Sequence, residues 1–320
     1  MGEPDIQTDK VKTQRHGTVT WVNVTNADSE AFSMLEREYH LHPLHLTESV
    51  QKIQHTEVES ENDYLFLVLH YPVFAAHTDK IHVGQVGVFL GKDYLVTVHT
   101  NTSPFIDDLF TGCQHNQDQA DKNFGPGSSY LLYVLISRLL GNIGSMADIV
   151  EGELDDIEGL VFENTQSDAL RIGRVRQKII RLRRLIGPKR ALLQDLAEEV
   201  AGSAGSEAAL YHETNVKTVN KLWEVVEEAK ETIEIYKDSD FTTSTEQTNR
   251  ILAILTLVFT FTIPITVMGT LYGMNVDLPG GIEAGPWKFL GTYTTFGLVI
   301  VFSMALAFGM YIYFKKKRWF

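Results

Sequence analysis

Two long stretches near the C-terminus, residues 251–276 and 289–314, contain no charged side chain. About 20 consecutive apolar residues are enough for an α-helix to cross a bilayer. A buried core helix is the alternative interpretation, but cores rarely use two such stretches so close together. We therefore predict a membrane-embedded C-terminal part. Its expected segments are a first transmembrane helix at 249–275, an external loop at 276–288, a second transmembrane helix at 289–314 and a basic tail at 315–320.

The N-terminal part instead has the pattern of a mixed α/β domain. Short apolar runs of strand length, some alternating with polar residues, predict strands at residues 17–24, 64–70, 83–90 and 94–99. Helical periodicity lies between the first two strands and is clearest at 27–40, where Asp28 or Ser29 would cap the helix. We expect this α/β domain to occupy residues 1–126 and to end at the Gly125-Pro126-Gly127 break.

Long helices are predicted between the α/β domain and the membrane. Over residues 127–248 strand signals disappear and Glu, Lys, Arg, Leu and Ile dominate. We expect turns at Gly187-Pro188 and at Gly202–Gly205. The last helical pattern runs from Glu207 to Tyr272 without a clear break. A helix of that length would extend for about 100 Å and would continue into the first span.

Charge and composition restrict the function and the location. The formal net charge of −13 argues against nucleic acid as a partner. The single cysteine, Cys113, excludes a disulfide framework and a zinc site built on cysteines. The residues up to Gly17 are polar, so we expect no signal peptide. The Lys/Arg cluster after the second span favours a cytoplasmic C-terminus, and two spans then place the N-terminus in the cytoplasm as well.

No enzyme motif is present: the sequence lacks GxxxxGK[ST], HExxH, GxSxG and a CxxC pair, so we expect no enzymatic activity and no bound cofactor. His40, His42 and His45 cluster in the segment HLHPLH. Either these rings form a zinc site, or they pack and cap at a junction between two helices. We favour packing and capping, because we find no acid or cysteine at ligand spacing beside them.

One face of the first span combines polar and apolar side chains. Steps of three and four residues place on it Asn249, Leu252, Thr256, Phe259, Ile263, Thr266 and Thr270. The threonines could simply bond their own backbone while the apolar residues face lipid. In a pore, the same face would alternate polar rings with apolar constrictions. Two spans cannot enclose a pore, so this interpretation requires an oligomer.

Motifs along nearly the whole chain resemble the CorA family of divalent-cation channels, with the zinc-associated ZntB branch as a neighbour. The most specific is Gly-Met-Asn at 273–275, at the outer end of the first of two C-terminal spans. Further matching segments are WVNV at 21–24, HPL at 42–44, YLFLVLH at 64–70, YLLYVLISRL at 130–139, TIPIT at 262–266 and KKKRWF at 315–320.

The resemblance implies a homopentamer in the cell (inner) membrane, with cytoplasmic α/β domains that form a funnel and one long helix per chain along the pore. Gly273, Met274 and Asn275 would form the outer selectivity filter, and Asn249 a polar ring at the cytoplasmic end. Asn275 amide oxygens can accept hydrogen bonds from the waters that Mg²⁺ keeps. Two acids of the external loop, Asp277 and Glu283, would raise the local cation concentration.

Regulation and ion preference are less well defined by the resemblance. The family pairs an acid that follows the YLFLVLH-like strand with one on the long helix, but the matching positions here are Ala75 and Thr214. Asp79 and Glu213 lie close by, and Asp238 aligns with an acid near the inner mouth, so these three are candidate ligands for regulatory Mg²⁺. We expect Mg²⁺ as the cargo, with Co²⁺ or Ni²⁺ as further ions. A zinc transporter of the same fold and a two-span membrane sensor without transport are the alternatives.

Overall fold

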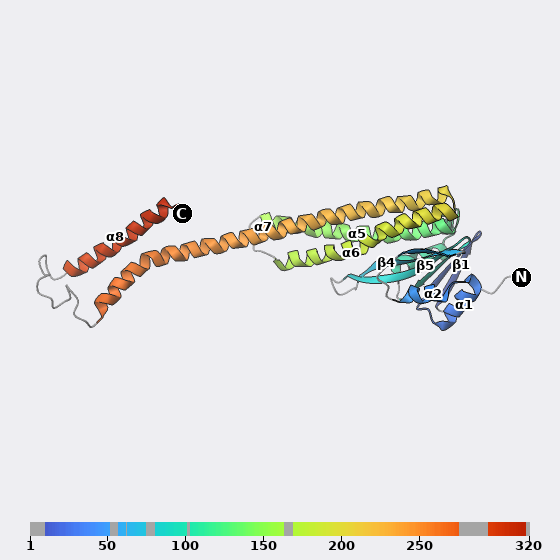
Figure 1. The fold of residues 1–320 in the computed structure, drawn as a ribbon, viewed down its shortest axis with the longest axis horizontal. Coiled ribbons are helices and arrows are strands. Elements are labelled where there is room, and N and C mark those ends of the chain that lie inside the picture. The colour runs from blue at the N-terminus through green and yellow to red at the C-terminus, as the bar shows by residue number, and fades with distance from the viewer. Residues whose placement is uncertain are drawn as a thin grey trace. The chain divides into compact units, whose positions relative to one another are not determined.

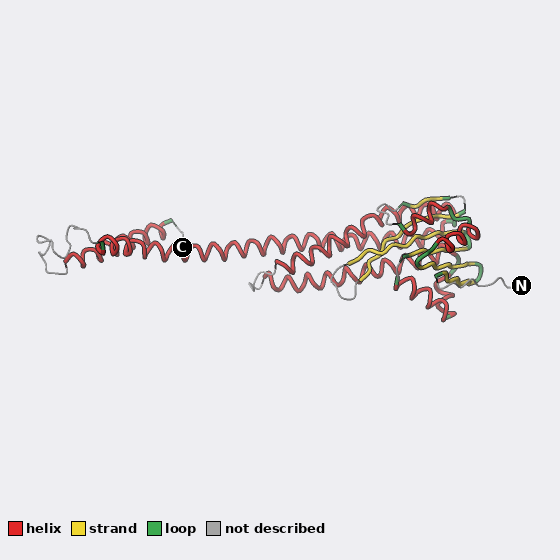
Figure 2. The backbone as a smooth tube through the Cα atoms, turned by 90° about the horizontal axis from the view of Figure 1, so that it is seen from below, coloured by secondary structure: helices red, strands yellow, loops and turns green. Residues whose placement is uncertain are grey.

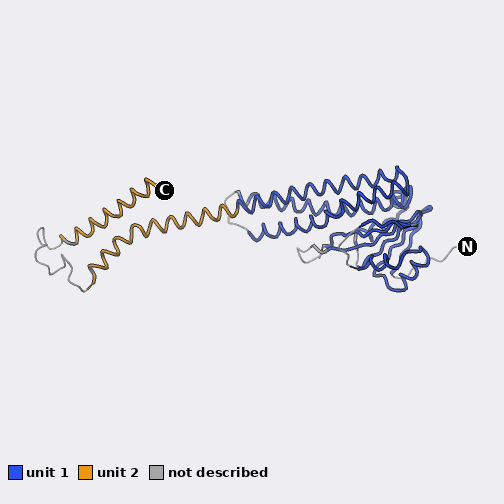
Figure 3. The backbone as a smooth tube through the Cα atoms, in the orientation of Figure 1, with its two compact units in different colours: residues 1–239 blue, residues 240–320 orange. Residues whose placement is uncertain are grey.

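The computed structural model describes residues 10–51, 57–61, 63–74, 81–100, 103–162, 169–274 and 294–317. The chain forms two compact units, an N-terminal unit of residues 1–239 and a C-terminal unit of residues 240–320 (Figure 3). Helix α7, Ser206–Gly273, begins in the first unit and ends in the second. The single long helix expected from Glu207 to Tyr272 is therefore confirmed.

A six-stranded mixed sheet organises the N-terminal unit (Figure 2). Its strands, in the order β1-β2-β6-β5-β4-β3, are β1 Val11–His16, β2 Val19–Thr25, β6 Tyr94–His99, β5 Ile81–Gly91, β4 Tyr64–Phe74 and β3 Val58–Ser60. Among these described strands, only β2 and β6 pair in parallel. The four predicted strands are confirmed, whereas β1 and β3 were not predicted. Both are edge strands with few buried side chains, so they carry little apolar signal.

Short helices flank the sheet: α1 Ser29–Tyr39, α2 Pro43–Val50, α3 Pro104–His115 and α4 Gln117–Phe124. Asp28 caps α1, as expected, because its side chain accepts a hydrogen bond from the Ala31 N–H at 3.0 Å. Helix α4 ends at Phe124 and is capped by Gly125, whose φ of 48° is positive, as glycine allows. The turn there separates α4 from the long helices that follow.

Two hydrophobic cores lie on opposite faces of the sheet, and β4 contributes to both. Phe66 and Val68 belong to the core shared with α1 and α2, while Leu65 and Leu67 belong to the core shared with the other helices. Figure 1 shows these two layers, with α1 and α2 on one side of the sheet and α5, α6 and the first part of α7 on the other. The period of two along a strand produces this division.

The long helices α5, Ser128–Phe162, and α6, Ala169–Ser203, run beside the first part of α7. The predicted turn at Gly187-Pro188 is wrong, since α6 continues through Pro188. Ile186 and Lys189 are both buried there, so packing on each side of the proline outweighs its missing hydrogen bond. The expected turn at Gly202–Gly205 is confirmed: α6 ends at Ser203 and Gly205 has a φ of 92°.

The C-terminal unit consists of the end of α7 and of α8, Thr294–Lys316. By length and composition, three helices of the described chain could cross a membrane, namely α5, α7 and α8. Half of the most apolar window of α5 is buried in the chain, whereas none of the corresponding window of α7 is. The apolar character of α5 therefore matches the core it occupies. The apolar surfaces of α7 and α8 are mostly exposed in the described chain, so they must be covered by lipid or by another protein chain.

Candidate functional site

Seven side chains predicted to share one face all lie on the C-terminal part of α7, and all seven are exposed in the single chain. They are Asn249, Leu252, Thr256, Phe259, Ile263, Thr266 and Thr270. Leu252, Phe259 and Ile263 have exposures of 55%, 58% and 55%. The described residues of the chain leave this face open.

The threonine hydroxyls of this face bond their own helix. Thr256 donates to the Leu252 carbonyl at 2.8 Å, and Thr266 donates to the Thr262 carbonyl at 2.9 Å. Thr270 donates to the Thr266 carbonyl at 2.7 Å. The threonines therefore do bond their own backbone, which is one of the two interpretations of this face given above. Because each hydroxyl hydrogen is committed to a carbonyl, the oxygen shows only its lone pairs outward, and this face accepts hydrogen bonds.

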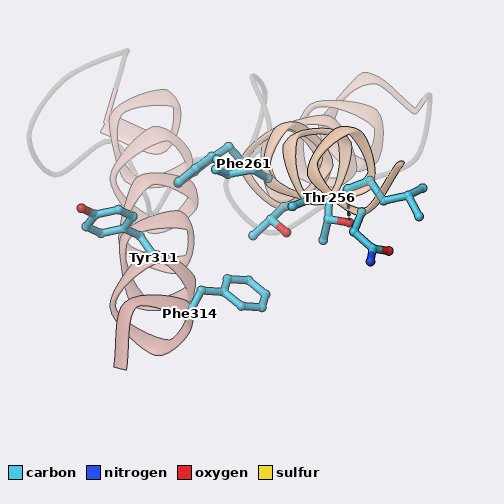
Figure 4. A pocket seen from close by; sticks show the side chains of 9 residues that line it. Thr256, Phe261, Tyr311 and Phe314 are labelled. Carbon is cyan, nitrogen blue, oxygen red and sulfur yellow. Dashed lines mark hydrogen bonds between the residues drawn. The ribbon is translucent and has the colours of Figure 1, made fainter. Parts of the chain in front are cut away.

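Helix α8 lies beside this face and leaves most of it free. A shallow pocket of about 220 Å³ is lined by Asn249, Leu252 and Thr256 together with residues of α7 and α8 that include Phe261, Tyr311 and Phe314. Phe261 and Phe314 project into the space between the two helices (Figure 4). The other four members of the face do not line this pocket.

The expected filter is only partly within the described residues. Gly273 ends α7, and the Met274 N–H donates to the Leu271 carbonyl at 3.4 Å, so the helix closes where the Gly-Met-Asn motif begins. Asn275 and the acids Asp277 and Glu283 lie outside the described residues, as do Ala75 and Asp79. Their predicted roles stay predictions.

Two candidate regulatory acids lie on the part of α7 that belongs to the N-terminal unit. Glu213 is exposed. Asp238 is also exposed and forms an ion pair of 3.5 Å with Lys237. The two acids are separated by about 37 Å along the helix, at 1.5 Å per residue, so they cannot share one ion within a chain. Thr214, at the family position, donates its hydroxyl to the Leu210 carbonyl at 3.2 Å.

The histidine cluster packs and caps, as favoured from the sequence. His42 caps α2, because its Nδ1 accepts from the Leu44 N–H at 3.2 Å. The His45 ring is buried, and its Nδ1 lies 2.8 Å from the Tyr64 hydroxyl. The statement that no acid has ligand spacing is wrong, however. Glu48 follows His45 by three positions on α2, and that i, i+3 spacing was the signal missed.

Two further buried titratable groups lie in the N-terminal unit. Complete burial lowers the pKa of Lys189 to about 7, and its ammonium donates to the Leu185 carbonyl at 2.7 Å. Burial also lowers the pKa of His212 to about 4, and the His212 Nε2 lies 3.1 Å from the Ser129 carbonyl oxygen. Neither group was identified from the sequence, where each stands in an ordinary helical pattern.

Sequence comparisons match nearly the whole chain to one family. The family model described as "CorA-like Mg2+ transporter protein" matches residues 16–316. The putative metal ion transporter YfjQ of Bacillus subtilis is 27% identical over 94% of this chain and 89% of its own length. The cobalt/magnesium transport protein CorA of Thermotoga maritima is 23% identical over 94% of this chain and 84% of its own.

Structural comparisons agree on the fold. The complete CorA magnesium transporter of Methanocaldococcus jannaschii superposes with a TM-score of 0.69 at 18% identity, over 95% of this chain and 92% of that chain. The cytoplasmic domain of ZntB from Vibrio parahaemolyticus covers 71% of this chain and 88% of its own, with a TM-score of 0.58 at 14% identity. At these identities the similarity concerns the fold alone. The fold matches the expectation of an α/β domain with long helices and an apolar C-terminal part.

Proposed function

Because this chain belongs to the CorA-like Mg2+ transporter family, we propose that it assembles into a membrane channel for Mg²⁺ with the exposed face of α7 along the ion path. Divalent-cation transport is the function common to the family. Magnesium as the main cargo, Co²⁺ or Ni²⁺ as further cargo, and assembly as a pentamer belong to the proposal. The observation that carries it is the α7 face itself, which is open in the single chain and presents acceptor oxygens between apolar rings.

Acceptor oxygens suit a hydrated ion. Mg²⁺ dehydrates reluctantly and usually keeps several waters. Those waters point their hydrogens outward, so the groups that hold them must accept hydrogen bonds. Thr256, Thr266 and Thr270 do so because their own hydrogens are already donated to the helix. An Asn275 ring would add amide oxygens at the outer end without the strong binding of carboxylates.

The apolar members of the face supply the barrier. Leu252, Phe259 and Ile263 would form narrow rings between the polar ones, and such rings close a pore by dewetting. A ring requires several copies, because two helices cannot surround a pore. Five copies would bring one α7 each, and α8 and lipid would then cover the remaining apolar surface.

Orientation and driving force follow from charge. The basic tail at 315–320 favours the cytoplasmic side, which also places the N-terminal unit there. Gly-Met-Asn, Asp277 and Glu283 would then face outward, where the two acids attract cations. An inside-negative potential favours Mg²⁺ uptake by about 4.6 kcal/mol per 100 mV, twice the value for a single charge. No other energy source is then required.

Flux into liposomes tests the proposal. Purified protein is reconstituted in vesicles that hold a Mg²⁺-sensitive dye, and uptake is driven by an inside-negative potential. We expect uptake in the wild type and its loss in Asn275→Ala with the oligomer intact on size exclusion. Absence of flux in the wild type would instead favour a two-span sensor. Parallel runs with Zn²⁺ decide between a magnesium channel and a zinc transporter of the same fold.

A matched pair of threonines tests the path along α7. Thr256→Val removes an acceptor from the proposed face. Thr262→Val removes a similar exposed threonine, bonded to the Val258 carbonyl at 2.7 Å. Thr262 lies about 120° from Thr256 around the helix, beyond the edge of the face that Thr266 marks. We expect a several-fold slower Mg²⁺ flux only in Thr256→Val. Equal rates in both variants would remove this face from the ion path.

A further inference from the structure

One histidine and two glutamates converge where α2 meets β3. His45 and Glu48 share one face of α2, and Glu59 lies in the three-residue strand β3. One ligand atom from each of the three residues lies within 4.8 Å of the other two. From this cluster we propose that His45, Glu48 and Glu59 form a binding site for a transition-metal ion such as Zn²⁺, Co²⁺ or Ni²⁺, separate from α7.

The distances are close to those of a metal site. The His45 Nε2 lies 3.1 Å from the Glu59 Oε2. In tetrahedral zinc sites, metal–ligand bonds of about 2.0–2.1 Å place two ligand atoms about 3.3 Å apart. This pair therefore needs almost no movement. The Glu48 carboxylate has to approach by up to about 1.5 Å, which its rotatable side chain allows, and water completes the coordination.

Surrounding residues already hold the imidazole in place. The Tyr64 hydroxyl lies 2.8 Å from Nδ1 and accepts from the His42 N–H at 3.0 Å. The His45 ring stacks on Phe66 with centroids 4.6 Å apart and planes at 13°. Phe66 is in turn the cross-strand partner of Glu59. Metal-bound histidines typically have such a partner on the second nitrogen, which fixes the ring and the tautomer.

The tautomer can change without loss of that partner. A metal on Nε2 requires the proton of the neutral imidazole to sit on Nδ1. There it can be donated to the Tyr64 oxygen, because a phenol both accepts and donates. Burial raises the pKa of Tyr64, so the hydroxyl stays protonated and adds no third negative charge to those of Glu48 and Glu59.

Charge and ligand type define the ion. Within the described parts of the chain, no Lys or Arg pairs with the carboxylate of Glu48 or Glu59, so the two acids have only His45 as a possible cationic neighbour. Imidazole suits Zn²⁺, Ni²⁺ and related ions, whereas Mg²⁺ prefers oxygen ligands. The site is thus selective against Mg²⁺, the proposed main cargo of α7. Its occupancy would fasten the edge strand β3 to α2.

Calorimetry on the full-length protein in detergent tests the site. Zn²⁺ is titrated in excess Mg²⁺, which fills sites made only of oxygens. Glu48→Gln is the decisive variant, because its carboxylate makes no hydrogen bond within the described chain and its loss should leave the fold intact. Glu36→Gln, an exposed glutamate on the adjacent α1, is the matched control.

We expect wild type and Glu36→Gln to bind one Zn²⁺ per chain with similar affinity. The affinity of Glu48→Gln and of Glu59→Gln for this Zn²⁺ should be at least tenfold lower. Zinc X-ray absorption should report an imidazole nitrogen at about 2.0 Å in wild type, with that signal reduced in Glu48→Gln. Equal Zn²⁺ affinity and stoichiometry in all four proteins would overturn the site. The result does not depend on Mg²⁺ flux, so it is separable from the proposed transport.

Discussion

At the residue scale, Lys189 is the least ordinary side chain of the N-terminal unit. It is only 3% exposed, and within the described residues its side chain donates one hydrogen bond, to the carbonyl of Leu185. Its neighbour Pro188 has no N–H to donate to the preceding helical turn. That missing N–H leaves the Arg184 carbonyl without its helical donor, and the Lys189 ammonium bonds the next carbonyl along the chain, that of Leu185. This arrangement costs desolvation free energy, since a buried charge with one neutral acceptor is poorly compensated.

The first prediction concerns the pH dependence of that cost. The folded-state pKa of Lys189 is lowered to about 7 from 10.5. Below pH 7 the amine is charged in both states and the full penalty is present. As pH rises from 7 towards 10.5, the folded state loses its proton first and stability increases. Lys189→Met should therefore raise the free energy of unfolding by about 2 kcal/mol at pH 6, and by less at pH 9.

Thermal unfolding of the full-length protein, followed by tryptophan fluorescence at both pH values, measures this difference. Lys221→Met, an exposed lysine on α7, is the control and should change the midpoint little at either pH. A destabilised Lys189→Met at pH 6 would mean that the bond to Leu185 outweighs desolvation.

His212 gives a second prediction, at acid pH. Its folded-state pKa is lowered to about 4 by burial, below the unfolded value of about 6.5. The stabilising effect of the neutral, buried His212 ring is complete above pH 6.5. It is lost as pH falls towards 4, because the unfolded chain gains the proton first. The loss by pH 4.5 should be about 2–3 kcal/mol. His212→Gln should lose less stability than wild type between pH 7 and 4.5, whereas exposed His115→Gln should behave as wild type.

At the element scale, helices and strands with a clear apolar period could be predicted from the sequence. Elements that depend on tertiary contacts could not. The strands β2, β4, β5 and β6 contain apolar runs, so they could be located in the sequence. The edge strand β1 consists mostly of polar residues, so it could not. The helix through Pro188 could not be foreseen, because the buried residues around it come together only in the fold. The α7 face was recognisable from its spacing. The Glu59 contribution to the His45 cluster was not, since strand pairing brings it there.

The third prediction tests the apolar rings of α7. Leu252→Ser and Ile263→Ser place a hydroxyl on the proposed pore face, lower the dewetting barrier and should raise Mg²⁺ leak into liposomes several-fold. Ile254→Ser is the control, because Ile254 matches Leu252 in exposure, 56% against 55%, and points about 160° away around the helix. A leak that rises equally in Ile254→Ser would show that serine merely loosens the helix packing.

At the scale of the whole molecule, the proposed regulation by Mg²⁺ would depend on contacts between copies. Glu213 and Asp238 are too far apart to share an ion, so any bridging site that uses them takes its other ligands elsewhere, including from a neighbouring chain. Acids that face each other across an interface repel without a cation and attract through one. A ligand shifts a conformational equilibrium only by its differential affinity, so several weak sites per oligomer would be needed.

The fourth prediction follows. About 10–20 mM Mg²⁺ should protect the N-terminal unit from protease, and an Asp79→Lys/Glu213→Lys double variant should be cleaved as fast as the wild type without Mg²⁺. Glu207→Lys, at an exposed acid in the first turn of α7, makes one such charge reversal away from the proposed site and should retain protection. Wild-type cleavage that ignores Mg²⁺ would mean that this chain, with Ala75 and Thr214 at the family positions, is gated by another signal.

The division of β4 between two cores has a consequence for how the chain tolerates insertions and deletions. Leu65 and Leu67 face one layer of helices and Phe66 and Val68 face the other. Adding one residue inside β4 would turn the side chains that follow it to the opposite faces and mismatch both layers at once, whereas adding two would keep each set on its own side. This strand should therefore tolerate insertions or deletions of an even number of residues, but not of an odd number.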